Sequence, residues 1–508
     1  MRNRNLGIAL SYLNTGLSMV CGFFLSSFLV KMLGDTEYGL YQMVTSFASY
    51  LVLLEFGTGT AMTRNISKCR AQNGEKQEIQ KNISTIWTIS LLLAAIILAA
   101  SVVFFCKIGN IYVNLSNQQV VYAQKVFVFE ALYLIISFLS NTTNGIVLGF
   151  EKYKIGPIVC VIRLILRTIL LVALVTAFRF AIIIVIVDFF VSTVVALLMF
   201  GFCFVKLNVS FSPKWFDFAV FKDTLPLCMA MFIQTIVNQA NSNVDQFIIG
   251  IKLTPEQVSF YSIGLFFYGT FSSLTTVPIS MYAPQIVKDV TAKVDDNILM
   301  EHLIAPSRLI TLIGSTVLFG FFVVGRQFIS IFYGQQYEVS WYVALIIMIP
   351  MMINMSNGIL INVLDALNKR MSRSFVLLLT TIANIILTVL WIDLWGIIGA
   401  CLATAVCTII GQITLMNIYY SRVLKIKVLY LYYRTYKGIL IPQIVASVLA
   451  FFIGRMVCNN IVSFLASGFL YVSAFAILFY LFGSQPNEKE KIKNCIELII
   501  HIVRRDKK

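Results

Sequence analysis

The sequence predicts an all-α polytopic membrane protein with about 14 transmembrane helices. The 508-residue chain is 59% hydrophobic but only 12% charged, whereas a soluble domain carries roughly 25% charged residues. Long apolar runs follow one another with short polar segments between them. Because a spanning helix needs about 20 mostly apolar residues, these runs predict a bundle whose outer surface is solvated by lipid.

Fourteen segments have the length and composition of a span. They are 6–33, 38–63, 83–106, 119–148, 155–177, 180–205, 223–251, 257–286, 301–325, 337–365, 374–392, 396–421, 438–457 and 460–483. The first follows MRNRN and is longer than the apolar region of a signal peptide, so we interpret it as a retained helix. The longest connection, 64–82, is too short for a separate globular domain.

The basic residues predict the orientation of these helices. Of the 39 Lys and Arg residues, 29 lie at the two ends or in the loops that share their face, and seven lie in loops of the opposite face. Positive loops stay on the cytoplasmic side, so we expect both termini in the cytoplasm. This distribution also explains the net charge of +16 without nucleic acid as a partner.

Two internal matches predict a repeat. NTTNGIV at 141–147 matches NMSNGIL at 354–360, and the turn that ends at Tyr41 matches the turn that ends at Tyr261. The offsets of 213 and 220 are nearly equal. We therefore expect two six-helix lobes (6+6), 1–221 and 222–432, related by an axis along the membrane normal. Two additional C-terminal helices in 433–484 and a basic cytoplasmic tail, 485–508, follow; the tail either lies on membrane lipids or is solvated.

Charged side chains within spans are costly and commonly face a cavity. Arg163 and Arg167 are four residues apart and share one face of a helix, and Arg308 lies at a similar depth in its own helix. We interpret these three arginines as candidates for binding an anionic head group in a cationic cavity. Static ion pairs that hold the helices together are the alternative.

Four acidic residues within spans are candidates for ion coupling or for structural pairs: Glu55, Glu130, Asp188 and Asp245. Asp245 lies in the run NQANSNVDQ, which is unusually polar for a spanning segment. If transport is coupled to an ion gradient, we expect protons or sodium ions to enter through Asp245 or Glu55. The sequence indicates no other cofactor.

The sequence contains no motif typical of an enzyme. Walker, G-x-S-x-G and H-E-x-x-H motifs are missing, and two histidines with scattered cysteines predict no metal site. Asp35 and Glu37 form an acidic pair in the first external loop, but this loop of about five residues leaves no room for a catalytic subdomain. We interpret it as a capped hairpin turn and expect a transporter, not an enzyme.

The stretch GDTEYGLYQMVTSFASYLVLLEFGTGTAMTRNISK, at 34–68, resembles the start of bacterial polysaccharide flippases of the multidrug/oligosaccharidyl-lipid/polysaccharide exporter superfamily. The family positions are Gly34, Tyr38, Gly39 and Tyr41 in the turn, Gly57 in the acidic-F-G element, and Arg64 before the basic loop. A second family pattern, N-x-x-D-x-x-I-I-G, is met at Asp245 but has Ser242 in place of its Asn.

The resemblance implies alternating-access transport of undecaprenyl-diphosphate-linked oligosaccharide across the bacterial cytoplasmic (inner) membrane. The product would be O-antigen of lipopolysaccharide, capsule or exopolysaccharide, and other polysaccharide-assembly proteins would be partners. A lipid II-type flippase and a multidrug exporter of the same superfamily remain alternatives. A glycosyltransferase or polymerase fits less well, because no large external loop is present. The sequence leaves the sugar and the oligomeric state open, with a monomer as the simplest arrangement.

Overall fold

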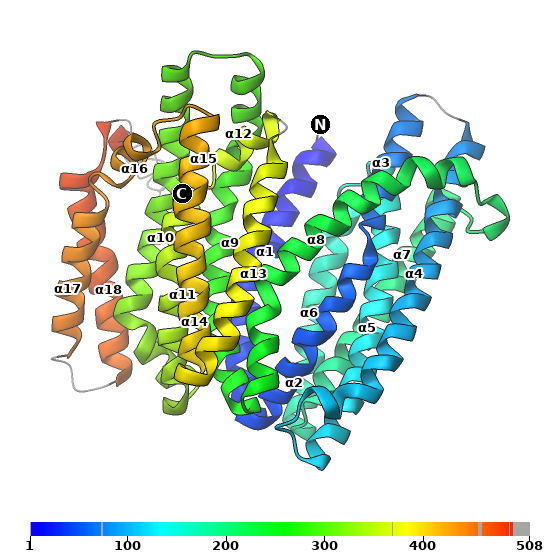
Figure 1. Ribbon diagram of the computed structural model, residues 1–508, viewed down its shortest axis with the longest axis horizontal. Coiled ribbons are helices and arrows are strands. Elements are labelled where there is room, and N and C mark those ends of the chain that lie inside the picture. The colour runs from blue at the N-terminus through cyan, green and yellow to red at the C-terminus, as the bar shows by residue number, and fades with distance from the viewer. Residues whose placement is uncertain (1, 73–74, 368, 456–459, 487, 491–508) are drawn as a thin grey trace, which may run out of the picture. The chain divides into compact units, whose positions relative to one another are not determined.

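The computed structural model describes residues 2–72, 75–367, 369–455, 460–486 and 488–490, which form helices joined by short turns (Figure 1). The chain divides into two compact units. Unit 1 comprises Met1–Ile263 and Ile385–Ala400, and unit 2 comprises Gly264–Asn384 and Cys401–Lys508. The predicted lobe boundaries at residues 221 and 432 rest on the sequence repeat. The division into two units does not test that repeat, so these boundaries stay a prediction.

Unit 1 is built around α5, which packs against α2, α3, α4 and α7. Its elements are α1 (Arg2–Leu33), α2 (Asp35–Ala48), η1 (Ser49–Glu55), α3 (Thr58–Ala71), α4 (Lys76–Ile111), α5 (Asn117–Gly149), α6 (Ile155–Phe178), α7 (Ile182–Leu207), η2 (Pro213–Trp215), α8 (Phe218–Lys252), the start of α9 (Pro255–Thr291) and the end of α13 (Arg370–Trp395). Ser116 and Gln119 begin α5 with a capping box, which satisfies N–H groups that have no partner within the helix.

Unit 2 is built around α10, which packs against α11, α16, α17 and α18. Besides the rest of α9 and α13, its elements are α10 (Asp296–Phe332), η3 (Gln335–Glu338), α11 (Val339–Ser356), α12 (Leu360–Ala366), α14 (Ile397–Cys407), the π-helical segment η4 (Thr408–Leu415), α15 (Met416–Val423), α16 (Val428–Tyr436), α17 (Leu440–Arg455), α18 (Asn460–Leu478) and the π-helical segment η5 (Phe479–Gly483). Helices α17 and α18 lie side by side (Figure 1).

Within the described ranges, ten helices are long and apolar enough to cross a membrane, and an eleventh results if the bent pair Val428–Tyr436 and Leu440–Ile453 counts as one span. The predicted spans 38–63, 223–251 and 257–286 do not meet this test. The first is broken after Glu55 into shorter helices, and the other two correspond to the long helices α8 and α9, whose described residues do not reach the required apolar character. The prediction of an all-helical, multi-pass membrane protein is confirmed at this coarser level.

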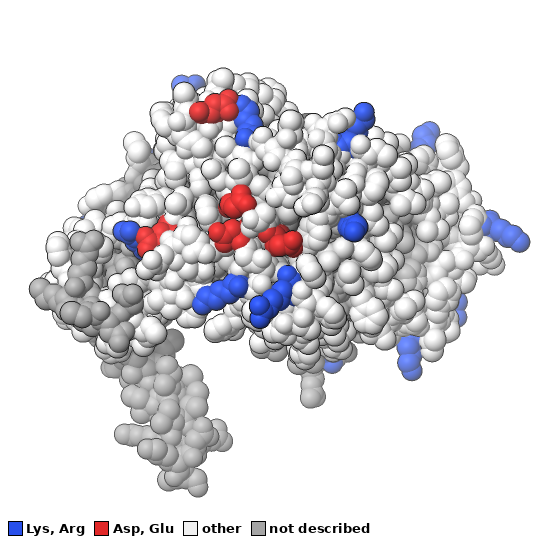
Figure 2. Space-filling view, turned by 90° about the horizontal axis from the view of Figure 1, so that it is seen from below, with Lys and Arg blue, Asp and Glu red and all other residues white. Residues whose placement is uncertain are grey.

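The surface is that of a protein solvated by lipid. Large apolar side chains stand exposed along α4, α6, α13, α17 and α18, and Phe469 retains 77% of its accessible surface. Soluble monomers rarely expose apolar patches of such extent. In the face seen in Figure 2, most of the visible surface carries neither acidic nor basic side chains.

Two glycines from the matched sequence motifs occupy similar packing positions. A Cβ on Gly145 of α5 would collide with the backbone carbonyl of Gly59 in α3, and a Cβ on Gly358 would collide with the side chain of Ile279 in α9. Gly59 and Ile279 are themselves 220 residues apart in the sequence. In both motifs, therefore, a small residue lets two helices approach closely.

Candidate functional site

A cluster of buried charges lies in unit 1 where α5, α6 and α7 pack together. Arg167 of α6 pairs with Asp188 of α7 at two points: Nε donates to Oδ1, and Nη2 donates to Oδ2 at 2.9 Å. Glu130 of α5 is 6% exposed and is close enough to both groups to interact with their charges. This charge cluster, Glu130, Arg167 and Asp188, brings together three residues that the sequence identified in three separate helices.

Arg163 lies one helical turn from Arg167 on α6, with a different partner. Its Nη2 donates to the Tyr133 hydroxyl at 3.1 Å, and its guanidinium lies 5.8 Å from the centre of the Tyr133 ring. Tyr133 also lies close to Arg167. Arg163 pairs with no carboxylate among the residues that the structure describes, so it is a cation held by a neutral ring.

The tyrosines of the first motif lie beside this charge cluster. Tyr41 of α2 is close to Glu130, Arg167 and Asp188, and its ring is 6.2 Å from that of Tyr38. The Tyr38 hydroxyl accepts a hydrogen bond from the side chain of Gln42 at 2.8 Å. The turn that carries the family motif and the charges of α5, α6 and α7, which are far apart in the sequence, therefore form one site.

The end of unit 1 next to this site is closed by contacts between α2 and the turn between α8 and α9. Thr36 donates to Glu256 Oε1 at 2.6 Å. Gly39 lies so close to the Pro255 carbonyl that a Cβ would collide with it. Partial burial raises the pKa of Glu256, but hydrogen bonds from Thr36, its own backbone N–H and Thr254 outweigh burial and bring the pKa below its ordinary value of 4.5.

Glu37, one of the two acidic residues of the first loop, contacts the start of α7. It accepts hydrogen bonds from the Tyr122 hydroxyl at 2.6 Å and from the Ala181 N–H at 3.0 Å, where α7 begins. An anionic side chain at a helix N-terminus satisfies free N–H groups and complements the helix dipole. Glu37 therefore has the geometry of a cap for α7.

Asp245 is buried, and its side chain makes hydrogen bonds that join α8 to neighbouring helices. Its carboxylate accepts from the Thr388 hydroxyl at 3.1 Å and from the Tyr261 hydroxyl at 3.3 Å. The next residue, Gln246, donates to Ser262 at 3.0 Å. The side chain of Ser242, at which the family pattern departs, lies outside the described side chains.

Glu55 lies at the break in the second predicted span. The next two residues, Phe56 and Gly57, both have positive φ, at 50° and 65°. The Glu55 carboxyl lies within hydrogen-bonding reach of the Asn141 side chain on α5. Arg64, nine residues further on in α3, is exposed. Neither residue belongs to the charge cluster around Arg167.

Arg308 belongs to unit 2 and has a different environment from Arg163 and Arg167. It is 2% exposed. It donates to both oxygens of Glu488, at 2.9 and 3.1 Å, and to the carbonyls of Arg434, Lys437 and Gly483 at 3.0, 2.7 and 3.3 Å. All three guanidinium nitrogens therefore donate within the protein. This geometry is that of a structural clamp at the ends of α16 and η5.

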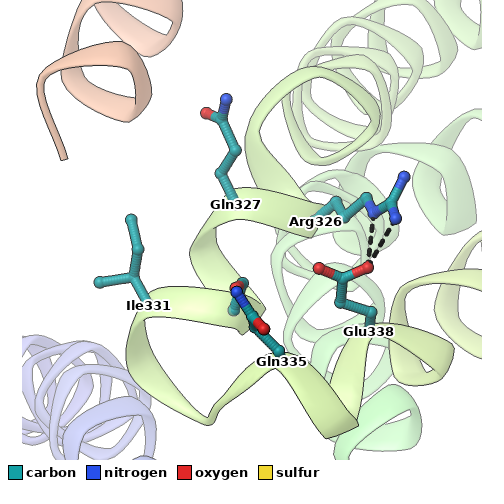
Figure 3. A pocket seen from close by; sticks show the side chains of 6 residues that line it. Arg326, Gln327, Ile331, Gln335 and Glu338 are labelled. Atoms are coloured by element: carbon teal, nitrogen blue, oxygen red, sulfur yellow. Dashed lines mark hydrogen bonds and ion pairs between the residues drawn. The ribbon is translucent and has the colours of Figure 1, made fainter. Parts of the chain in front are cut away.

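A pocket of about 210 Å³ opens in unit 2 at the end of α10 (Figure 3). It is lined by Arg326, Gln327, Ser330, Ile331, Gln335 and Glu338. Arg326 donates to Glu338 through Nη2 and Nε, at 2.6 and 2.8 Å. Because the arginine in this lining is already paired, the pocket offers less to an anionic head group than the Arg163 side of α6 does.

Sequence reasoning missed several residues that the structure brings to these sites. Tyr133 follows Glu130 by three residues and therefore shares its helix face, so a search for polar neighbours at helical spacing could have found it. Tyr122 and Glu488 carry no such signal. They meet Glu37 and Arg308 from distances of 85 and 180 residues in the sequence.

Several solved structures share the fold of this chain. The chain matches the lipid II flippase MurJ in an inward closed conformation with a TM-score of 0.73 at 16% identity, over 93% of this chain and 98% of that one. It matches an inward-facing multidrug resistance MATE family transporter of the MOP superfamily with a TM-score of 0.67 at 13% identity, over 84% and 100%. A MOP superfamily transporter from Pyrococcus furiosus gives 0.54 at 14%, over 82% and 95%. The chain has the MOP superfamily fold.

The particular family follows from the sequence match. The model of the polysaccharide biosynthesis protein family (Polysacc_synt) matches residues 6–288, which is more than half of the chain. The chain belongs to this family, and the predicted family is confirmed. No curated protein matches the sequence at a significant level.

Proposed function

We propose that this transporter is a flippase that carries undecaprenyl-diphosphate-linked oligosaccharide across the bacterial cytoplasmic membrane by alternating access. The diphosphate binds at Arg163 and Arg167, while the polyprenyl chain stays in the lipid. The translocated glycan serves surface polysaccharide assembly. The family supports the glycan part of this proposal, and the charges of α6 support the diphosphate part.

The observation that carries the proposal is the state of Arg163. A guanidinium in a spanning helix is costly unless it is paired, yet the partner of Arg163 in the described structure is the neutral Tyr133. Arg167 lies four residues away, about 6 Å along the helix axis. Two arginines one turn apart suit a ligand with two adjacent phosphates, because guanidinium groups bind phosphate oxygens by strong, charge-assisted hydrogen bonds.

The proposed topology has fourteen spans in a 6+6+2 arrangement, with both termini in the cytoplasm. It counts the broken segment 38–63 and the long helices α8 and α9 as spans. Helix α8 has 35 residues, which gives about 52 Å at 1.5 Å per residue and is more than enough to cross a bilayer. Broken helices are tolerated in a membrane where they line a water-filled path. The paired close-packed glycines support the repeat.

Two other substrates deserve comparison. Lipid II carries the same polyprenyl diphosphate, so the arginines do not separate it from other glycan lipids. A cationic drug is disfavoured, because the ligand-facing groups of α6 are arginines. The family match favours a polysaccharide repeat unit as the glycan.

The proposal predicts that Arg163→Gln abolishes most transport. One charge-assisted hydrogen bond contributes about 1.5–3 kcal/mol, so head-group binding should weaken by roughly 10- to 100-fold. The measurement is surface polysaccharide, together with lipid-linked repeat units retained in the membrane, in a host whose own flippase gene is deleted and replaced by this one.

Lys125→Gln is the matched control. Lys125 is an exposed cation on the neighbouring helix α5, so its removal changes net charge equally and should leave transport unchanged. Both variants must be present in the membrane at the wild-type level. Full surface polysaccharide with Arg163→Gln would overturn the assignment of the head-group site.

A further inference from the structure

Asp188 makes a two-point contact with Arg167 that has the geometry of a phosphate contact. Two parallel N–H···O bonds join the guanidinium to both carboxylate oxygens. The same fork binds carboxylate and phosphate, because both present two oxygens at a similar spacing. A phosphate that binds Arg167 in this way must therefore occupy the position that Asp188 holds here.

The charge cluster holds more carboxyl groups than a structural pair needs. Arg167 faces Asp188 and, from α5, the carboxyl group of Glu130. Glu130 is buried, with 6% of its surface exposed, and makes no hydrogen bond with the described residues. A pair that served only to hold α6 against α7 has no use for a second buried carboxyl group, because burying a polar group without a hydrogen bond costs stability.

The contact is also accessible. The Arg167 side chain retains 30% of its accessible surface, whereas that of Asp188 retains 9%. Arg308 of the same chain is an inaccessible arginine by comparison: it is 2% exposed and donates to surrounding backbone carbonyls. Arg167 is thus paired with Asp188 but remains accessible to a ligand. Arg163, one turn away, can bind a first phosphate while Arg167 exchanges Asp188 for the second phosphate.

A second position is available for the displaced carboxylate. Tyr41 is close to Asp188, and its hydroxyl makes no hydrogen bond with the described residues. A tyrosine hydroxyl donates well to a carboxylate. Released from Arg167, Asp188 can accept a hydrogen bond from Tyr41, which gives this motif tyrosine a role in the exchange.

We propose that Asp188 is a placeholder for the substrate phosphate: it neutralises Arg167 while the transporter is empty, and the diphosphate displaces it on binding. This inference rests on the proposed function. It makes Asp188 a residue that sets both affinity and turnover. The substrate must compete with an internal carboxylate to bind, and the same carboxylate expels the head group after the membrane is crossed.

The test compares neutral variants in head-group binding and in transport. Asp188→Asn keeps the side-chain volume and one acceptor but removes the competing charge. We expect it to bind farnesyl diphosphate about 10- to 100-fold more tightly than wild type, the range that corresponds to one charge-assisted hydrogen bond. In transport, KM and kcat should fall together, because release becomes slow. The protein is the purified full chain in lipid nanodiscs, and titration calorimetry measures binding, with farnesol as the uncharged control probe.

The double variant Arg167→Gln with Asp188→Asn separates the placeholder from a structural pair. If the pair only holds the helices, replacing both partners with neutral side chains preserves binding and transport. If Asp188 is a placeholder, the double variant loses head-group affinity while its unfolding temperature stays near that of wild type. Glu130→Gln is the matched single control, and it should tighten binding less than Asp188→Asn does.

The outcomes separate this inference from the function on which it rests. If wild type binds farnesyl diphosphate and Arg163→Gln weakens that binding, the head-group site stands. If Asp188→Asn then binds no more tightly, the placeholder is wrong and the head-group site remains. If the double variant transports normally, the placeholder is wrong and Arg167 is not part of the head-group site. If wild type does not distinguish farnesyl diphosphate from farnesol, the head-group site itself is refuted, and the placeholder with it.

Discussion

Arg308 and Arg163 lie at similar depths in their helices and have opposite surroundings. Glu488 and three backbone carbonyls surround Arg308, which leaves it 2% exposed. Among the described residues, the hydrogen-bond partner of Arg163 is the hydroxyl of Tyr133. The sequence identified both as costly charges, but it could not tell them apart. The partner of Arg308 lies 180 residues further along the chain, and backbone carbonyls carry no sequence signal.

At this scale we predict that Arg308→Gln destabilises the protein without changing the intrinsic affinity for the head group. Loss of a buried charge pair leaves its partners unsatisfied and typically costs about 3–5 kcal/mol. The thermal unfolding temperature in detergent should fall, while farnesyl diphosphate binding per folded molecule stays at the wild-type value. Arg163→Gln should show the reverse pattern. Weakened binding by a stable Arg308→Gln protein would place Arg308 in the head-group site after all.

At the scale of elements, the second predicted span shows that the length of an apolar run does not by itself predict one continuous helix. Residues 38–63 contain one apolar run, but the structure breaks it into α2, η1 and α3, with Phe56 and Gly57 in the left-handed region. Sequence reasoning noted Gly57 as a family position. At the break, Phe56 stacks on Phe232 of α8 with 4.2 Å between ring centres, and the sequence carries no signal for this contact between residues far apart in the chain.

Gly57→Ala tests the importance of this break. Gly57 has φ of 65°, and an added Cβ would lie 2.6 Å from Cβ of Met231. Left-handed backbone costs a non-glycine residue about 1–2 kcal/mol, and the collision adds to that cost. We expect a lower unfolding temperature and reduced transport. Gly16→Ala is the matched control, because nothing lies within 4 Å of its Cβ position in α1; it should be neutral or slightly stabilising. Equal stability of the two variants would contradict the account.

For the whole molecule, the contact between Thr36 and Glu256 joins two turns that the sequence matched at an offset of 220. The pKa of Glu256 lies below its ordinary value, so the stabilisation from its ionised form is present above pH 4.5 and is lost as the pH falls through the lowered pKa. The contact therefore persists at neutral pH. The proposed alternating access predicts that this contact opens during transport.

Much of the whole-molecule picture could be predicted from the sequence. The composition predicts a helical membrane protein, and residues 34–68 predict the family. Glu130, Arg167 and Asp188 were found as separate charges because each interrupts an apolar run. Their assembly into one charge cluster with Tyr41 and Tyr133 required the structure, because helix packing alone decides which faces meet.

Reconstituted translocation is the most direct test of the central claim that this protein flips a polyprenyl-diphosphate glycan. Proteoliposomes would contain the purified chain and labelled undecaprenyl-diphosphate oligosaccharide, with outer-leaflet lipid detected by an added, impermeant diphosphatase. A Thr36→Cys, Glu256→Cys pair in a background without native cysteines, joined by a short reducible thiol cross-linker, locks the closed end. A cross-linked Ser116→Cys, Gln119→Cys pair within one helix start is the control.

We predict that wild type raises the diphosphatase-accessible share above that of protein-free liposomes. The locked Thr36–Glu256 pair should prevent the rise, and reduction should restore it. Arg163→Gln should prevent it irreversibly, whereas the control pair should have no effect. Two results would contradict the account: an accessible share for folded, uncross-linked wild type that equals that of protein-free liposomes, or a rise that persists with Arg163→Gln.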